Sequence, residues 1–91
     1  MKTNKDRAMR ARAALLAHQI DDCHGSKVQA HAELAAAPAS ILKYLLADLR
    51  HWCDVNGFSY QEADRLAHET YTAEVVEARR AASAPTERRV R

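Results

Sequence analysis

Apolar residues recur every three or four positions along most of this chain, rather than at every second position, and this spacing predicts helices. The most regular stretch covers residues 39–55, where the apolar residues share an arc of about 140° on a helical wheel. They are Ile41, Leu42, Leu45, Leu46, Leu49, Trp52 and Cys53. We therefore predict that this helix is the central core helix of the fold.

Two helices are predicted before it. The first covers about residues 4–24, with Thr3 or Asn4 as its N-cap and Gly25 as a left-handed C-terminal cap. Its apolar line has the alternating spacing of four and three that suits one partner helix: Met9, Ala13, Leu16, Ile20 and Cys23. A capping box that begins at Ser26 predicts a short helix over residues 27–36.

One long helix is predicted after it, over residues 60–82. Gly57 ends the preceding helix, and Ser59 with Glu62 forms a second capping box. Because only a short turn separates residues 39–55 from residues 60–82, we expect an antiparallel helical hairpin whose apolar faces clasp each other as the core. The predicted fold class is all-α, a small bundle of three long helices and one short helix, with residues 1–82 as a single domain.

Composition agrees with this fold, because the chain has only two glycines and two prolines among 91 residues. Charge is segregated: residues 1–12 and 79–91 each carry a net charge of +4, and residues 13–78 carry −6. We predict that residues 83–91 form a disordered basic tail. The sequence has no apolar run long enough for a membrane span and no secretory signal, so we expect a cytoplasmic protein.

Five histidines and two cysteines raise the question of a zinc site. His51 and Cys53 are two positions apart on a helix, so their side chains diverge by about 200°. Cys23, His24 and His31 form the only cluster near flexible backbone, and they lack a Cys-x-x-Cys pair. We predict no metal, no cofactor and two buried free thiols that behave as small hydrophobic groups.

Tyr44, Asp48 and His51 lie on one row of the polar face of the predicted helix 39–55. No Ser or Cys nucleophile shares that face, which argues against an enzyme. The row is either a solvated helix face or an exposed binding surface. The candidate partner-binding residues are Tyr44, Asp48, Arg50, His51 and Asp54, with Arg10 and Arg12 second.

Glu74 is unusual because it falls near the middle of the apolar arc of the last helix. A buried carboxylate needs a partner, which Arg10 or Arg12 could supply if the first and last helices cross. The alternative is that the last helix has left the core by this residue and that Glu74 is simply exposed to water.

The run from Leu45 to Asp54, followed by Gly57, Ala63, Ala67 and the residues from Tyr71 to Glu74, forms a recognisable pattern. Over residues 41–75 the chain resembles small, uncharacterised accessory proteins carried by proteobacterial phages, plasmids and integrated elements. The resemblance implies a mobile-element protein that acts by stoichiometric binding, as inhibitors of host defence complexes do.

The predicted function is therefore a non-enzymatic protein-binding accessory protein of a mobile element, such as an anti-CRISPR-like inhibitor of a larger host or element-encoded protein. The alternative is a small dimeric regulator that binds nucleic acid through its basic N- and C-terminal arms. Self-association is expected in either case if the predicted helices expose more apolar surface than one copy can cover.

Overall fold

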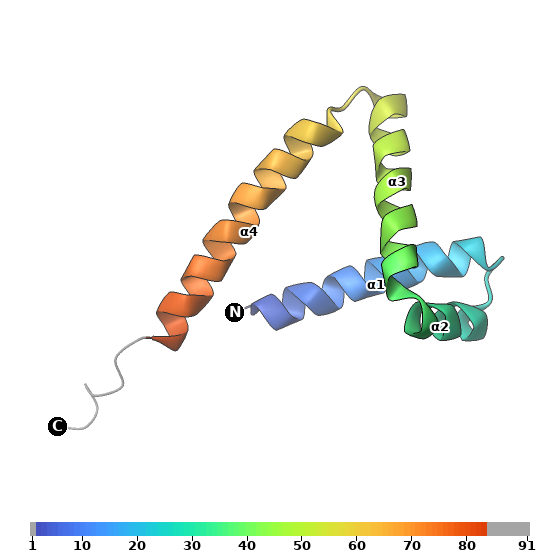
Figure 1. Cartoon of the computed structure of the whole chain (residues 1–91), viewed down its shortest axis with the longest axis horizontal. Coiled ribbons are helices and arrows are strands. Elements are labelled where there is room, and N and C mark those ends of the chain that lie inside the picture. The colour runs from blue at the N-terminus through green and yellow to red at the C-terminus, as the bar shows by residue number, and fades with distance from the viewer. Residues whose placement is uncertain (1, 84–91) are drawn as a thin grey trace.

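The computed structural model describes residues 2–83, and within this range the chain forms four α-helices and no strand. The helices are α1 (Asn4–Asp22), α2 (Lys27–Ala36), α3 (Pro38–Asn56) and α4 (Tyr60–Ala82). Figure 1 shows α2 folding back beneath the C-terminal part of α1, while α3 and α4 diverge from their connecting turn as the two arms of a V. The predicted all-α class and all four helices are confirmed. Except for Ser83, the predicted basic tail lies outside the described residues.

Local sequence signals account for the helix ends. Thr3 caps α1 in a reciprocal capping box, its hydroxyl accepting from the Asp6 amide and its own amide donating to the Asp6 carboxylate. Ser26 accepts from the Gln29 backbone amide at the start of α2, but the Gln29 side chain donates to Glu33, so only half of the capping box predicted there forms. α1 ends two residues earlier than expected, because the left-handed backbone begins at His24 (φ 55°) rather than at Gly25 (φ 90°).

The core lies where α1, α2 and α3 meet, which is not where the sequence placed it. Its buried residues come from all three helices: Gln19, Cys23, Ala30, Leu34 and Ile41. Helix α2 contributes Ala30, which is fully covered, and Leu34, whereas its Val28 faces solvent. The remaining buried residue, Cys53, is at the far end of α3.

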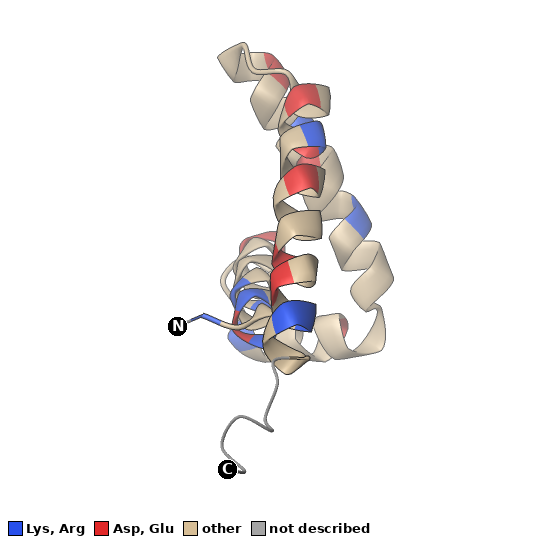
Figure 2. Ribbon diagram, turned by 90° about the vertical axis from the view of Figure 1, so that its left-hand side faces the viewer, with Lys and Arg blue, Asp and Glu red and all other residues tan. Residues whose placement is uncertain are grey.

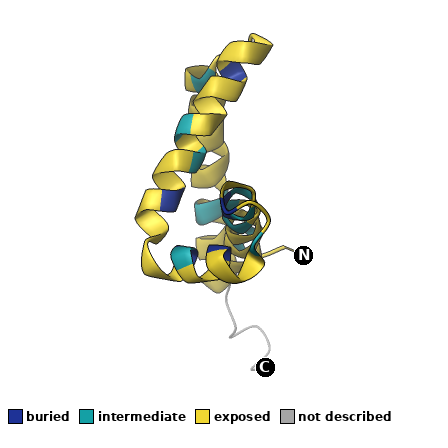
Figure 3. Cartoon of the chain, turned by 90° about the vertical axis from the view of Figure 1, so that its right-hand side faces the viewer, coloured by how far each residue is buried: buried dark blue, intermediate teal, exposed yellow. Residues whose placement is uncertain are grey.

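The prediction that α3 and α4 pack together as the core is wrong, although a short turn does connect the two helices. Trp52 is 56% exposed and Leu49 is 42% exposed, and no residue of α4 is buried. Most of the ribbon of α3 is accordingly drawn as exposed in Figure 3. The physical reason is divergence: the helices touch near the Gly57 turn and then separate, so the leucine-rich face of α3 meets no second apolar face.

Helix α1 contacts both arms of the V. The Arg7 guanidinium Nε lies 2.9 Å from Oε2 of Glu74 on α4, and the His18 Nε2 lies 2.6 Å from Oδ2 of Asp48 on α3. These contacts are eleven residues apart, which corresponds to roughly 16 Å along α1. Helix α1 therefore connects α3 and α4 across the V, and we call it the strut.

None of the helices within residues 2–83 combines the length and the apolar character that crossing a membrane would require.

Candidate partner-binding surface

The polar face of α3 carries a row of four residues at spacings of four, three and four, namely Tyr44, Asp48, His51 and Val55, which we call the outer row. Tyr44 is 56% exposed, Val55 is 84% exposed, and His51 is exposed as well. Tyrosine is one of the residue types that most often anchor protein interfaces. The row therefore offers apolar contact area within a polar surrounding.

Asp48 is the residue of this row that contacts a side chain on another helix. Its carboxylate is bound by His18 of α1, not by His51, so the structure does not form an Asp–His pair along α3. The Nδ1 atom of His18 is buried and has no hydrogen-bond partner. Asp48 is thus a positioning residue that ties α3 to α1, while its side chain remains 61% exposed within the outer row.

The other predicted binding residues on α3 lie off this row. Arg50 places its guanidinium carbon 4.5 Å from the centre of the Tyr60 ring, a cation–π contact that joins α3 to the start of α4. Asp54 is exposed, and Lys43 lies 4.6 Å over the ring of Tyr44. The structure therefore brings Tyr44, His51 and Asp54 to the free surface but engages Arg50 within the fold.

The opposite side of α3 carries a second row with the same spacing, Leu42, Leu46, Leu49 and Cys53, which we call the inner seam. It lies about 160° around the helix from the outer row. Its Cys53 end faces α4, since Cys53 lines an open depression of about 440 Å³ together with Ala63 and Leu66. The seam therefore faces into the V, where its three leucines are all exposed.

An aromatic pair closes the apex of the V. The rings of Trp52 and Phe58 are stacked, with centroids 5.5 Å apart and planes within 4° of each other. Both rings remain more than half exposed. Phe58, which lies in the turn before α4, thus packs against a side chain of α3. This exposed stack was missed from the sequence, because Trp52 was assigned to a core that the helices do not form.

Charge is distributed unequally between the helices. Figure 2 shows Lys and Arg gathered at the N-terminal end of α1 and Asp and Glu spread along α4. Between Tyr60 and Ala78, α4 carries five acidic residues and one basic residue, Arg65. Arg10 and Arg12 of α1 are both exposed. The predicted second binding region is therefore on the surface, close to an acidic helix.

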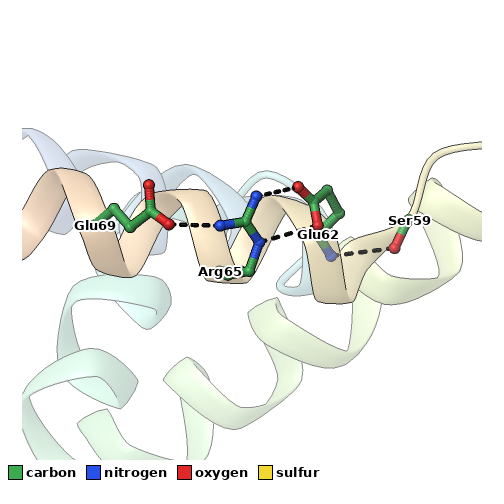
Figure 4. Close-up of polar contacts among 4 residues, drawn as sticks. All are labelled: Ser59, Glu62, Arg65 and Glu69. Carbon is green, nitrogen blue, oxygen red and sulfur yellow. Dashed lines mark hydrogen bonds and ion pairs between the residues drawn. The ribbon is translucent and has the colours of Figure 1, made fainter.

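Arg65 organises the exposed face of the first turns of α4 (Figure 4). It donates to the carboxylates of Glu62 and Glu69, one on each side. The hydrogen bonds between Arg65 and Glu62 lower the pKa of Glu62 and raise the pKa of Arg65. Ser59 caps the helix by accepting from the Glu62 amide, but the Glu62 carboxylate turns to Arg65, so only half of the predicted capping box forms.

A polar cluster joins α1 to α2 within the core. Glu33 accepts hydrogen bonds from the Gln29 amide nitrogen at 2.8 Å, from the Cys23 thiol at 3.4 Å and from Gln19. These donors, with Gln29 first, lower the pKa of Glu33. Burial, followed by the bond to Glu33, raises the pKa of the Cys23 thiol. The prediction that both cysteines are buried free thiols is confirmed.

Glu74 has a partner, and the partner is Arg7 rather than Arg10 or Arg12. Its side chain is 32% exposed, and its backbone oxygen also accepts from the amide group of Asn4 at 3.3 Å. The first and last helices therefore do meet at this point. The sequence did indicate that Glu74 needs a partner, because it places an acidic residue on an apolar arc. Which basic residue of α1 pairs with Glu74 depends on where the two helices cross.

Within residues 2–83, no three of the histidine, cysteine, aspartate and glutamate side chains come together in a way that could hold a metal ion. Comparison with known proteins gives no match: no family model, no curated protein and no solved structure is similar to this chain. The resemblance to mobile-element accessory proteins therefore remains a prediction from the sequence.

Proposed function

We propose that this protein is a non-enzymatic binding module that docks a larger protein through the outer row of α3. The observation that carries the proposal is the exposure of Tyr44, His51 and Val55 along one line of a helix that Asp48 joins to α1. A helix with anchors at this spacing fits the groove-and-helix mode of recognition. Asp54 and Arg10 add charge of both signs, which favours selection of one partner over others.

The sequence resemblance supplies the class of partner in this proposal, a host defence complex or another larger protein met by a mobile element. An inhibitor of this kind acts by occupying its target and needs no reaction of its own. The cell interior is the expected location, because such a target is found there.

A capture experiment with matched variants tests the docking surface. Tagged protein should retain a defined partner from host lysate, and replacement of both Tyr44 and His51 by alanine should reduce the retained amount by at least about tenfold, since anchors of this kind dominate interface energies. Val28→Ala is the control, because Val28 is 84% exposed but lies on α2. Equal capture by the Tyr44/His51 variant and the control would contradict a role for the outer row.

Nucleic-acid binding is the second candidate, and the exposed basic residues at the start of α1 favour it. Lys5, Arg10 and Arg12 are exposed there. If they contact phosphates, a gel shift should detect binding at ~50 mM salt, and replacement of Arg10 and Arg12 by glutamine should lower the slope of log affinity against log salt by about two. Lys27→Gln on α2 is the control. No shift at ~50 mM salt would remove this candidate.

A further inference from the structure

Helix α3 carries an open groove beside the inner seam, which we call the α3 groove. It has a volume of about 410 Å³ and is lined by residues of α3 alone: Ala39, Leu42, Lys43, Leu46, Ala47 and Arg50. Its two leucines, Leu42 and Leu46, are 46% and 39% exposed. Lys43 and Arg50 lie about 80° around the helix from the middle of the inner seam. The groove is therefore an apolar strip with a basic edge, and a ligand there can lie on α3 without contacting α4.

Positive charge gathers at this groove. Lys43 and Arg50 are exposed, and their contacts with tyrosine ring faces do not use up the N–H donors of the two cations. Among the described residues no side chain caps the start of α3, so the positive end of the helix dipole adds to these charges beside Ala39. Asp54, the acidic residue on this side of α3, lies one turn beyond Arg50 and past the end of the groove. A ligand in the groove should therefore carry negative charge near Lys43.

The spacing of the groove residues fits a helix as the ligand. Ala39, Leu42 and Leu46 follow one another at three and four positions, which is the spacing of residues that pack against another helix. Ala39 and Ala47 are small, so two helix backbones can approach each other closely there. Ala39 and Arg50 are eleven residues apart, which corresponds to roughly 16 Å along α3 or about three helical turns.

Helix α4 is the acidic helix of this chain, but three of its five carboxylates are already engaged within the chain. Glu62 and Glu69 bind Arg65, and Glu74 binds Arg7. A helix α3 from a second copy would bring its own Lys43 against the cations of the groove. Charge therefore favours a separate protein over a second copy as the source of the ligand.

We propose that the α3 groove binds an acidic amphipathic helix of another protein, about three turns long. Its apolar face lies on Leu42 and Leu46, and its carboxylates lie beside Lys43 and Arg50. The apolar contact supplies affinity, and the carboxylates select the partner and set the direction in which its helix lies. The groove is on a different side of α3 from the outer row, so the proposal does not depend on partner docking there.

Selection from a displayed library of helical peptides tests the proposal with the full chain, because the library lets the protein choose its ligand. Selected peptides should share an apolar line at spacings of three and four that is flanked by Asp or Glu. Replacing these acidic residues by glutamine in a selected peptide should weaken its binding about tenfold. Selection of basic or uncharged peptides, or of none, would overturn the proposal.

Variants of the chain then locate the site, with circular dichroism used to check that the helices remain. Leu46→Glu should weaken binding of a selected peptide by at least about 100-fold, because it places a carboxylate against the apolar face of the peptide. Val55→Glu is the matched control on the opposite side of α3 and should leave binding unchanged. Lys43→Glu should weaken binding about tenfold and Lys43→Arg should not. Binding that withstands Leu46→Glu overturns the location, and binding that withstands Lys43→Glu overturns the role of charge.

Sedimentation equilibrium separates this ligand from a second copy of the chain. A dimer at ~100 µM that Leu46→Glu dissociates would show that the groove is covered by a second copy, and it would overturn the proposal. A mass that Leu46→Glu leaves unchanged is the expected result.

Discussion

Arg7 and Glu74 are 67 positions apart in the sequence, and their side chains form the ion pair that joins the first helix to the last. Among the described residues, one further hydrogen bond joins these two helices: the Asn4 side-chain amide donates to the backbone oxygen of Glu74. The shape of the V therefore depends on a contact that is only partly shielded from water.

A double-mutant cycle measures what this pair contributes. Arg7→Gln and Glu74→Gln should each lower the free energy of unfolding, and the coupling between them should be about 0.5 kcal/mol, since both side chains are about one-third exposed and screened by solvent. Urea unfolding of the four proteins gives the value. Glu77→Gln, an exposed neighbour on α4, should show no coupling to Arg7→Gln.

The His18–Asp48 contact should matter more for the junction of α1 and α3. Replacing Asp48 by asparagine keeps its shape but removes its charge, and we expect a loss of about 1 kcal/mol in the free energy of unfolding. The His18 side chain is only 22% exposed, so water compensates poorly for the weaker bond to the uncharged amide oxygen. Asp54→Asn, on an exposed carboxylate of the same helix, is the control. Equal effects of the two substitutions would show that the contact has no special weight.

Glu33 should make the protein sensitive to acid. Its hydrogen bonds lower its pKa in the folded state below the usual value of 4.5, so it stabilises the fold when ionised and this stabilisation is lost as the pH falls through the folded-state pKa. Wild type should therefore exceed Glu33→Gln in stability at pH 7, and the difference should shrink as the pH falls below 4.5. Urea titrations at several pH values test this, and a constant difference would contradict it.

Ser59 sets where α4 begins. Ser59→Ala removes the hydroxyl that accepts from the Glu62 amide, and we expect a loss of about 1 kcal/mol. Amide hydrogen exchange should quicken in the first turn of α4. Ser83→Ala is the control, because Ser83 follows the other end of the helix, where its backbone amide rather than its side chain makes the capping bond. Unchanged exchange near Tyr60 would show that the Arg65 contacts hold the turn without the cap.

The sequence predicted the local structure well, because the signals for helix ends act over three or four residues. Thr3, Ser26 and Ser59 cap the helices that they were expected to cap, and Gly57 adopts the left-handed backbone that ends α3, with φ 76°. The burial of Cys23 and of Leu34 was also foreseeable from their places on apolar faces. Each of these features depends on neighbours within one or two turns.

The sequence could not show which helices would pack together. The leucines of the inner seam have a helical spacing that suits a partner helix, but this spacing does not tell whether the partner belongs to the same chain. The error over Trp52 has this origin. For the same reason the pairing of Asp48 with His18, which lies thirty residues earlier, was missed while the nearby His51 was considered.

The strut has a consequence for how the molecule would respond to its surroundings. The attachment of α1 to α4 is the partly exposed ion pair of Arg7 with Glu74, so dissolved salt weakens it. The Gly57 turn, in contrast, rests on backbone geometry that ions do not affect. The angle between α3 and α4 is therefore expected to fluctuate more as ionic strength rises, because α1 then holds α4 less firmly.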